Sequence, residues 1–206
     1  LGVDVVVLDP TPECPASRVA EQVEGAFDDT AAVRRLAERA DALTFEIELA
    51  DPDLLAEVGQ EYDVPVHPDP DTLRTIQDKH VQNEALADAG VPVPEFRRVD
   101  GPADLAAAVE TFDGAMLKAR TGGYDGRGNV PGAGPEDVAA AMADIAGPAM
   151  VEERVDFERE LAVMGCLGDG ERDTFPVTET IHREEILRES VAPARASTGV
   201  RDRARE

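Results

Sequence analysis

Residues 116–129 carry the residue types that a phosphate-binding site requires. They read M-L-K-A-R-T-G-G-Y-D-G-R-G-N, so a lysine on a short apolar run precedes a loop with four glycines. Glycine adopts positive φ without a Cβ penalty and lets backbone N–H groups approach an anion closely. A cation on the preceding strand, facing such a loop, is the arrangement that phosphate groups require. The same residues also suit a loop that only connects two strands, so this segment alone leaves both interpretations open.

Lysine is almost absent from the chain. Only Lys79 and Lys118 occur among 20 cationic residues, and the others are arginines. Where arginine serves elsewhere, a retained lysine indicates that a compact ammonium group is needed at that point. The alternative is that two lysines remain by chance.

Acidic residues follow two of the expected strands. Residues 151–155, V-E-E-R-V, end one strand, and Glu160 follows on the next. A strand end can bind an adenine edge through its backbone, and a carboxylate can bind ribose hydroxyls. Glu46 and Glu48 in T-F-E-I-E share a side if the backbone stays extended, at a strand end where α/β sheets bind ligands. Because the chain has 44 acidic residues, each of these remains equally a solvated surface acid.

The length and net charge limit the number of domains and the kinds of partner. The 206 residues suffice for one large domain or two small ones with a proper core. A net charge of −24 makes nucleic acid and anionic membranes unfavourable partners, and an anionic substrate would need a local basic pocket. The even spread of Asp and Glu over a regular apolar pattern indicates a surface adapted to high salt, and that regularity argues against a disordered acidic protein.

Cysteine usage and hydropathy favour a cytoplasmic protein. Cys14 and Cys166 are too few and too isolated for a disulfide framework or a zinc site. No apolar stretch is long enough to span a bilayer, and no signal peptide is visible. Because the chain starts with Leu-Gly at an expected strand, we expect that an N-terminal piece is missing.

The first part of the chain alternates strands with helices, which predicts a doubly wound parallel sheet. The apolar stripe of the first helix comes from Val33, Leu36 and Ala37, and that of the second from Leu54, Leu55 and Val58. We expect Asp29 to cap the first helix, Pro52 to open the second, and Gly90 to cap the last. The expected elements are strand 3–8, helix 30–40, strand 42–45, a helix from residue 52, strand 64–66, and helix 69–89 with a break near 75–77.

The pattern restarts after the extended connector 91–94 and predicts a compact α+β unit. The expected elements are strand 96–99, helix 102–111, strand 115–118, the glycine loop, helix 135–145, strand 150–155, an alternating strand over 157–167, further strands within 174–190, and the start of a helix in the last twelve residues.

Five segments together resemble the ATP-grasp superfamily and, within it, the 5-(carboxyamino)imidazole ribonucleotide synthase family of purine biosynthesis. The most specific parts are G-G-Y-D-G-R-G and the H-x-x-x-I-L-x-x-S-x-A-P-A pattern, and T-F-E-I-E at 44–48 also matches the family. The resemblance covers nearly the whole chain in the right order. The five segments are Q-D-K at 77–79, L-K-A-R-T-G-G-Y-D-G-R-G-N at 117–129, V-E-E-R-V at 151–155, F-E-R-E-L at 157–161 and H-R-E-E-I-L-R-E-S-V-A-P-A at 182–194.

The resemblance implies a Rossmann-like pre-ATP-grasp domain followed by an incomplete ATP-grasp fold, of mixed α/β and α+β class. The domains would be 1–92 with a linker helix, a small lid subdomain at 93–155, and the start of the C-terminal subdomain at 156–206. The implied reaction is ATP-driven carboxylation of 5-aminoimidazole ribonucleotide with bicarbonate through carboxyphosphate, and a homodimer is the family's common assembly.

The resemblance also implies roles for single residues. Lys79 and Lys118 would hold the α and β phosphates, and residues 122–128 would cover the β and γ phosphates. Tyr124 and Arg127 are our candidates for contact with bicarbonate or the aminoimidazole, and Glu46 and Glu48 for contact with the ribonucleotide. Glu152 and Val155 would bracket the adenine, Glu160 would bind the ribose, and His182 would face the nucleotide. The full set of expected nucleotide-binding residues is Lys79, Lys118, Gly122, Gly123, Tyr124, Asp125, Gly126, Arg127, Gly128, Asn129, Glu152, Glu153, Arg154, Val155, Glu160 and His182.

Two parts of the family pattern are not matched. The N-terminal glycine loop that would hold the substrate phosphate would precede Leu1, and the family's magnesium ligands would follow Ala194. We therefore expect a fragment with no Mg²⁺ ligand of its own and little activity alone, because magnesium is central to this transfer. The alternatives are a non-catalytic ATP-binding fragment, another ATP-grasp ligase such as the formate-dependent glycinamide ribonucleotide transformylase or biotin carboxylase, and an acidic scaffold. The tyrosine-containing glycine loop argues against both rival ligases.

Overall fold

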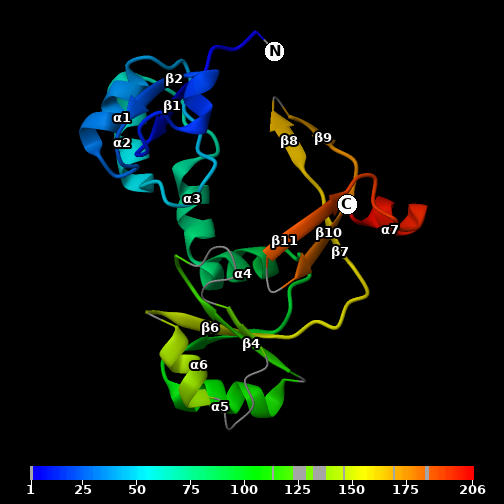
Figure 1. Cartoon of the computed structure of the whole chain (residues 1–206). Helices are drawn as coiled ribbons and strands as arrows, with labels where there is room; N and C mark the ends of the chain where they lie inside the picture. Colours follow the sequence, from blue (N-terminus) through cyan, green and yellow to red (C-terminus); the bar gives the residue numbers. More distant parts are fainter. Residues whose placement is uncertain are drawn as a thin grey trace. The chain divides into compact units, whose positions relative to one another are not determined.

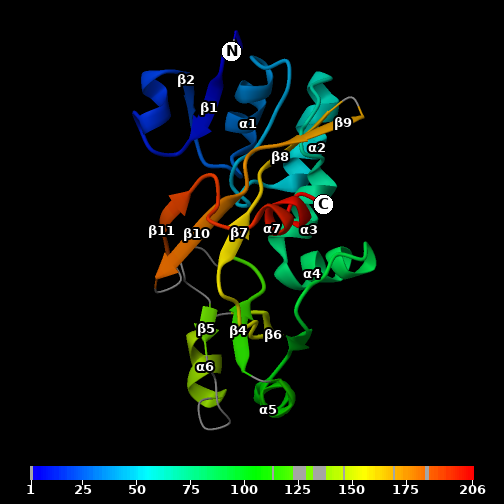
Figure 2. The same ribbon diagram turned by 90° about the vertical axis from the view of Figure 1, so that its right-hand side faces the viewer.

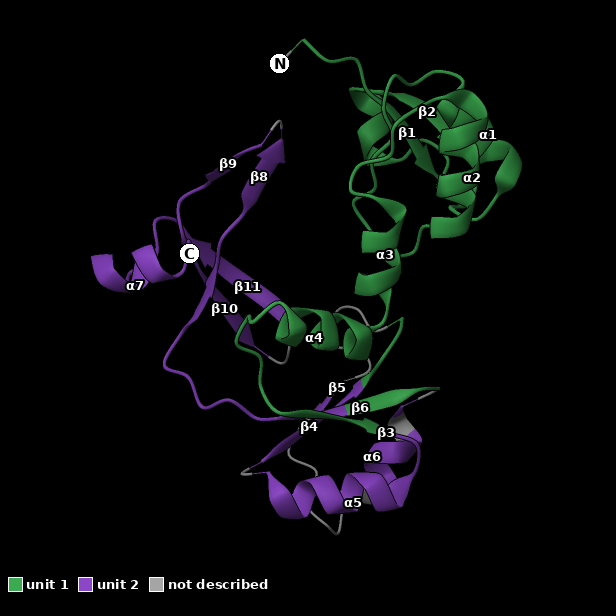
Figure 3. Cartoon of the chain, turned by 180° about the vertical axis from the view of Figure 1, so that it is seen from behind, with its two compact units in different colours: residues 1–98, 119–122, 147–150 green, residues 99–118, 123–146, 151–206 purple. Residues whose placement is uncertain are grey.

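The chain folds into two compact units, coloured separately in Figure 3. Unit 1 comprises residues 1–98, 119–122 and 147–150, and unit 2 comprises residues 99–118, 123–146 and 151–206. The computed structural model describes residues 2–112, 114–122, 129–131, 138–145, 147–168, 170–183 and 186–206.

Unit 1 contains a short parallel sheet with helices packed beside it (Figure 1). β1 (Val6–Asp9) pairs with β2 (Glu21–Glu24), and a single parallel bridge joins Leu43 to Val66. The helices of this unit are the 3-10 helix η1 (Pro15–Arg18), α1 (Thr30–Ala37), α2 (Pro52–Tyr62), α3 (Pro70–Gln77) and α4 (Lys79–Asp88).

An aspartate caps the start of each α-helix in unit 1. The side chains of Asp29, Asp51, Asp69 and Asp78 accept hydrogen bonds from backbone N–H groups in the first turns of α1, α2, α3 and α4. These N–H groups have no partner within the helix, so each cap contributes about 1 kcal/mol. The predicted cap at Asp29 is confirmed, and Pro52 occupies the first position of α2 as expected.

The core of unit 1 comes from one face of each of α1, α2 and α3. Val58 and Leu73 are completely buried, and the predicted stripes on α1 and α2 point inward. Full burial of a valine or leucine side chain contributes about 1.5–3 kcal/mol. The buried cluster is Val33, Ala37, Leu43, Leu54, Leu55, Val58, Val64 and Leu73.

A second sheet has four strands in the order β3-β6-β4-β5. In unit 2, α5 (Pro102–Thr111) and α6 (Val138–Asp144) lie on one face of its β4 and β6 strands (Figure 1). Leu105 of α5 and Leu117 of β4 are completely buried there. The strands are β3 (Phe96–Val99), β4 (Ala115–Ala119), β5 (Asn129–Pro131) and β6 (Ala149–Glu153).

The rest of unit 2 is an antiparallel sheet and a separate hairpin (Figure 2). In the sheet, β10 (Thr178–Arg183) lies between β7 (Glu160–Ala162) and β11 (Ile186–Val191). In the hairpin, β8 (Gly165–Gly168) pairs with β9 (Glu171–Thr174), and every residue of both strands is exposed. The last helix, α7 (Thr198–Arg203), begins after its N-cap Ser197.

Helices are predicted better than strands. β3 and α5 match the predicted 96–99 and 102–111, and the helix predicted over 69–89 breaks at Asp78, one residue after the expected 75–77. In contrast, α1 ends at Ala37 instead of residue 40. A capping residue marks a helix start within the local sequence, whereas the end of α1 has no such marker.

Four strand predictions are wrong. The strand predicted over 3–8 begins at Val6, and Val3 and Val5 are 74% and 54% exposed because pairing with β2 starts only at Val6. The strands predicted over 42–45 and 64–66 are reduced to the single bridge from Leu43 to Val66. The strand predicted over 157–167 is divided into β7 and β8. Strand limits depend on the partner strand, which an apolar run does not specify.

Within the described residues, no helix is both long and apolar enough to cross a membrane.

Gly59 of α2 allows close packing against the chain that follows the helix. A Cβ at this position would lie 2.9 Å from Val66 Cγ2 and 3.0 Å from the carbonyl oxygen of Val64. Alanine in an open helix is better than glycine by about 1 kcal/mol, but overpacking costs about 1–3 kcal/mol. We therefore expect Gly59→Ala to lower the free energy of unfolding, measured by urea denaturation.

The matched control is Gly199→Ala in α7, where a new Cβ meets nothing within 4 Å. We expect this substitution to leave the free energy of unfolding unchanged or slightly raised. Equal effects of the two substitutions would show that the contact at Gly59 does not limit the packing.

Candidate functional site

Strand β4 presents Lys118 on its polar face. Ala115, Leu117 and Ala119 are buried, whereas Met116 and Lys118 between them are only half-buried. Because successive side chains point to opposite faces of a strand, the three buried residues share one face of β4 and Lys118 lies on the other. The alternation of the sequence M-L-K-A thus fixes the face on which the ammonium group lies.

The Lys118 ammonium is paired with the Glu152 carboxylate of the neighbouring strand β6. Nζ of Lys118 donates to Oε2 of Glu152, and the two side chains are 26% and 12% exposed. Partial burial lowers the effective dielectric around the pair, so it is worth more than an ion pair in open solvent. Glu152, expected near an adenine, therefore also holds the lysine in place.

The glycine loop begins directly after this strand. Gly122 has a φ of +71°, which favours glycine, and β5 pairs antiparallel with β4 so that Asn129 lies opposite Lys118. The loop therefore does connect two strands of a hairpin, and a phosphate-binding role is compatible with that geometry. The predicted residues Gly123, Tyr124, Asp125, Gly126, Arg127 and Gly128 lie outside the described part of the chain.

The other predicted lysine, Lys79, is the first residue of α4 in unit 1. Its backbone N–H donates to the carbonyl oxygen of Arg120 at 2.9 Å. Asp78 accepts from Arg120 Nε at 2.9 Å and from Nη2 at 2.5 Å, so α4 is attached to residue 120 by both backbone and side chain. The Q-D-K motif thus marks a tertiary contact as well as a lysine.

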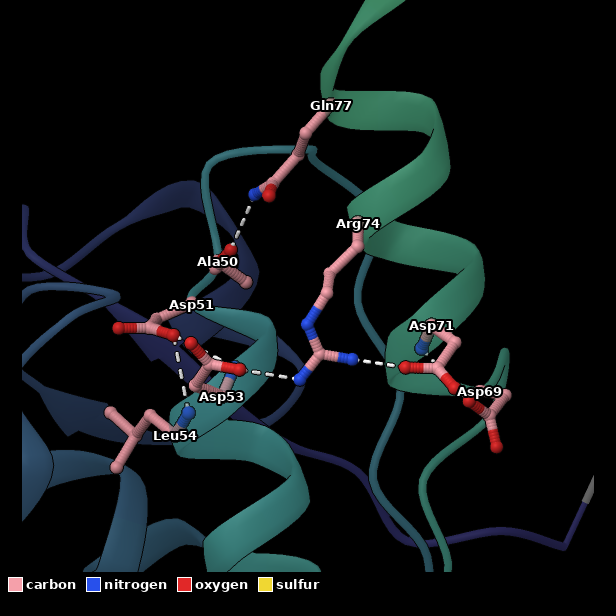
Figure 4. A network of polar contacts seen from close by, with 8 residues as sticks. All are labelled: Ala50, Asp51, Asp53, Leu54, Asp69, Asp71, Arg74 and Gln77. Atoms are coloured by element: carbon pink, nitrogen blue, oxygen red, sulfur yellow. Dashed lines mark hydrogen bonds and ion pairs between the residues drawn. The ribbon is translucent and has the colours of Figure 1, made fainter. Parts of the chain in front are cut away.

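Gln77 of the same motif holds the segment that carries Glu46 and Glu48. Its amide Nε2 donates to the carbonyl oxygens of Glu48 at 2.7 Å and Ala50 at 2.8 Å, and Figure 4 shows the latter bond. The backbone bends at residues 46–47 and turns at 48–49, so the extended conformation that would put both carboxylates on one side is not present. Both glutamates are exposed.

An open hollow of about 390 Å³ lies between α2 and α3, lined in part by Gly59, Val66 and Arg74. It contains none of the predicted site residues. The Arg74 guanidinium already contacts Asp53 at 2.5 Å and also Asp71 (Figure 4). This hollow is therefore a surface feature of the α2–α3 packing.

Glu160 and His182 lie together on the antiparallel sheet. Glu160 of β7 pairs with Thr180 of β10, and His182 Nδ1 lies 2.9 Å from Glu160 Oε2. A carboxylate on Nδ1 orients the imidazole ring and leaves Nε2 available. The structure therefore brings together the two residues expected at the ribose and the nucleotide.

The remaining residues of the predicted adenine segment follow Glu152. Glu153 ends β6, the Arg154 N–H donates to Gly114 O at 3.1 Å, and Val155 is exposed. Residues 151–155 thus form the end of β6, as predicted, and the backbone of Arg154 attaches them to Gly114.

Glu179 of β10, in the antiparallel sheet, is a buried carboxylate that the sequence did not single out. Glu179 is only 8% exposed, and it accepts from Arg195 Nε at 3.0 Å, Nη2 at 3.1 Å and the backbone N–H at 3.2 Å. Arg159 Nη1 lies 3.9 Å away. These contacts join residue 159 of the F-E-R-E-L segment to the residues on either side of the segment 182–194. No local sequence signal shows which of the many glutamates and arginines pair.

Among the described residues, no group of three or more His, Cys, Asp or Glu side chains is arranged to hold a metal ion.

Two protein families match the chain. Residues 1–77 match the ribonucleotide synthetase preATP-grasp domain, and residues 84–206 match the ATP-grasp domain. The change from one to the other falls between α3 and the middle of α4.

The chain is also similar to individual proteins. It is 34% identical to the N5-carboxyaminoimidazole ribonucleotide synthase of Pseudomonas aeruginosa, over 93% of this chain and 54% of that protein. It is 34% identical to the phosphoribosylaminoimidazole carboxylase of Ogataea methanolica, over 99% of this chain and 39% of that protein. The crystal structure of N5-carboxyaminoimidazole synthase from Aspergillus clavatus with ADP and 5-aminoimidazole ribonucleotide aligns with a TM-score of 0.89 at 33% identity, covering 98% and 54% of the two chains. The chain thus spans about half the length of these relatives or less.

The contact between Glu179 and Arg195 predicts a pH-dependent stability. The hydrogen bond from the Arg195 side chain lowers the pKa of Glu179 below its usual 4.5, although burial opposes the shift. A lowered pKa in the folded state means that the carboxylate stabilises the fold above pH 4.5 and that this contribution is lost as the pH falls through the lowered value. We expect Glu179→Gln to lower the Tm at neutral pH, and the difference from the unaltered chain to shrink in acid, measured by thermal unfolding over a pH series.

The control is Glu171→Gln on the exposed strand β9, which we expect to leave the Tm unchanged at every pH. A Tm deficit of Glu179→Gln that stays constant well below pH 4.5 would contradict the role of the ionised carboxylate.

Proposed function

The chain belongs to the ATP-grasp family, and on this premise we propose that its protein uses ATP and bicarbonate to carboxylate 5-aminoimidazole ribonucleotide in purine biosynthesis. The similarity to carboxyaminoimidazole ribonucleotide synthases and the order of the sequence motifs support this substrate. The single observation that carries the proposal is the Lys118 ammonium, held half-buried by Glu152 directly before the glycine loop.

In the proposed reaction, a bicarbonate oxygen attacks the γ-phosphorus of ATP and ADP leaves, which gives carboxyphosphate. Carboxyphosphate breaks down to carbon dioxide and inorganic phosphate. The exocyclic amine of the ribonucleotide then forms a bond to the carbon of carbon dioxide and loses a proton, which gives the carbamate. Phosphoryl transfer of this kind depends on neutralised phosphate charge and correct positioning, and the reactive intermediate requires that water is excluded.

Lys118 suits a phosphate because its ammonium group is held in place and still has N–H donors available for a further hydrogen bond. An ammonium has three N–H donors, and the contact with Glu152 uses one of them. A phosphate oxygen can therefore be added without removing the carboxylate that orients the side chain. The net charge of −24 repels ATP at long range, so such local cations must supply the attraction.

The proposal assigns the other predicted residues as follows. Lys79 joins Lys118 at the phosphates, residues 122–128 cover them, and Tyr124 and Arg127 reach bicarbonate or the aminoimidazole. Glu160 binds the ribose, His182 faces the nucleotide, and Glu46 or Glu48 faces the ribonucleotide. The residues assigned to the adenine are Glu152, Glu153, Arg154 and Val155, and Asn129 closes the loop.

Magnesium is part of the proposal because it neutralises the β and γ phosphates in such transfers. The described residues offer no cluster that fits the ion, so no step is assigned to a metal ligand of this chain. We further propose domains at 1–92, 93–155 and 156–206, a homodimeric assembly, a cytoplasmic location, and a surface adapted to high salt.

The first test is ATP binding, measured by calorimetry on the unaltered chain and on Lys118→Ala. Loss of a charged hydrogen bond to a phosphate is worth about 1.5–3 kcal/mol, so we expect the affinity to fall by roughly ten- to a hundredfold. Arg18→Ala is the control, since it removes an exposed cation on η1. Equal affinities of the unaltered chain and Lys118→Ala would contradict the phosphate role.

The second test is the substrate requirement for ADP release by the protein. We expect release to depend on both 5-aminoimidazole ribonucleotide and bicarbonate, because only their combination completes the proposed reaction. Turnover supported by formate in place of bicarbonate would instead indicate a transformylase. ATP binding without release under any of these conditions would favour a non-catalytic ATP-binding protein.

A further inference from the structure

Asp78 forms hydrogen bonds in two directions. Its Oδ1 accepts from the N–H groups of His80 at 3.0 Å and Val81 at 3.4 Å, which caps α4. The same carboxylate accepts two bonds from the Arg120 guanidinium, from Nε at 2.9 Å and from Nη2 at 2.5 Å. One side chain therefore both starts the helix and attaches its start to another segment.

The backbone repeats this attachment. The Lys79 N–H donates to Arg120 O at 2.9 Å, and the Arg120 N–H donates to Pro148 O at 2.9 Å. Arg120 is also only two residues after Lys118 along the chain. The first residue of α4 is thus fixed to a point next to the other lysine in the sequence.

Low exposure and two-pronged geometry make the ion pair between Arg120 and Asp78 rigid. The Arg120 and Asp78 side chains are only 14% and 22% exposed, and two parallel bonds between guanidinium and carboxylate fix orientation as well as distance. Burial raises the pKa of Asp78, but the bonds from Arg120, Val81 and His80 outweigh it and leave the pKa below its usual value. Asp78 is therefore ionised throughout the neutral range.

A helix cap alone does not require this arrangement. Asp51 caps α2 through the N–H groups of Asp53 and Leu54, and among the described contacts it has no arginine partner. Lys79 itself is unfavourable for the helix, because a cation in the first turn opposes the helix dipole by about 0.3–1 kcal/mol. An anion bound at the start of α4 would interact favourably with both the Lys79 ammonium and the helix dipole.

We propose that Asp78 and Arg120 are positioning residues that fix the start of α4 so that the Lys79 ammonium is held ready for a nucleotide phosphate. This inference rests on the proposed function. Asp78 and Arg120 act through Lys79 and do not touch the nucleotide themselves. Lys79 is half-buried, and the described part of the chain offers its ammonium no carboxylate partner.

The test uses variants that keep the helix cap and remove the ion pair. Asp78→Asn retains a capping oxygen, since asparagine caps as well as aspartate, but loses the charge that pairs with Arg120. Arg120→Lys retains the charge and loses the two-pronged geometry. The matched control is Asp51→Asn, which makes the same change at a cap without an arginine partner.

ATP affinity is measured by calorimetry for each variant, with and without Lys79→Ala. We expect Asp78→Asn and Arg120→Lys each to weaken ATP binding about tenfold, the size of one charged hydrogen bond, and Asp51→Asn to have no effect. In the Lys79→Ala background we expect no further loss, because residues that act through Lys79 are not additive with it.

Unchanged affinity in both variants, or an equal loss with and without Lys79, would overturn the positioning role while Lys118→Ala still tests the proposed function. Absence of any ATP binding by the unaltered chain would overturn the proposed function and the positioning role with it. Thermal unfolding identifies a variant that has lost its fold, and Arg120→Lys then carries the comparison because it leaves the cap residue intact.

Discussion

A strand can hold an ammonium group steadily on one face only if its other face is buried, and β4 meets this condition. Leu117 and its small neighbours Ala115 and Ala119 are buried, so Lys118 must point to the opposite side. Glu152 on the adjacent strand then pairs with it at low exposure. Burial of one face of β4 thus sets the direction of the cation on the other, and the ATP proposal depends on that direction.

The strongly acidic composition is used structurally throughout the chain. Four aspartates cap the helices of unit 1, and Glu179 organises the segment around Arg195. Such carboxylates are satisfied by N–H groups, whereas exposed pairs such as that between Arg74 and Asp53 contribute little. In a chain with 44 acidic residues, a cation that can still bind a ligand is a stronger indication of an anion-binding site than any single carboxylate is of function. Arginine supplies the structural pairs, and the two lysines carry the proposed phosphate contacts.

The strand pairing makes the glycine-rich segment the connection of a hairpin, and the proposed phosphate role is compatible with that pairing. Because β5 pairs with β4 opposite Lys118, the loop is the connection of a hairpin, and that same connection keeps its ends at the ammonium group. The contact of Asp78 with Arg120 adds a second constraint at the start of this loop. Because the pairing of β4 with β5 holds the two ends of the loop together, the entropic cost of closing the loop is met by the strand pairing.

Local sequence determined the features that depend on near neighbours: the helix caps, the apolar stripes of α1 and α2, the bounds of β3 and α5, and the alternation that points Lys118 outward. The motifs also determined the family, because their order and spacing are carried by the chain itself. Tertiary structure alone decided which charges pair. Nothing near Asp78 in sequence indicates Arg120, and nothing near Glu179 indicates Arg195. The strand limits at β1 and at residues 42–45 depended in the same way on a distant partner, since a hydrogen-bonded pair or an ion pair is specified by both of its members and the local sequence contains only one.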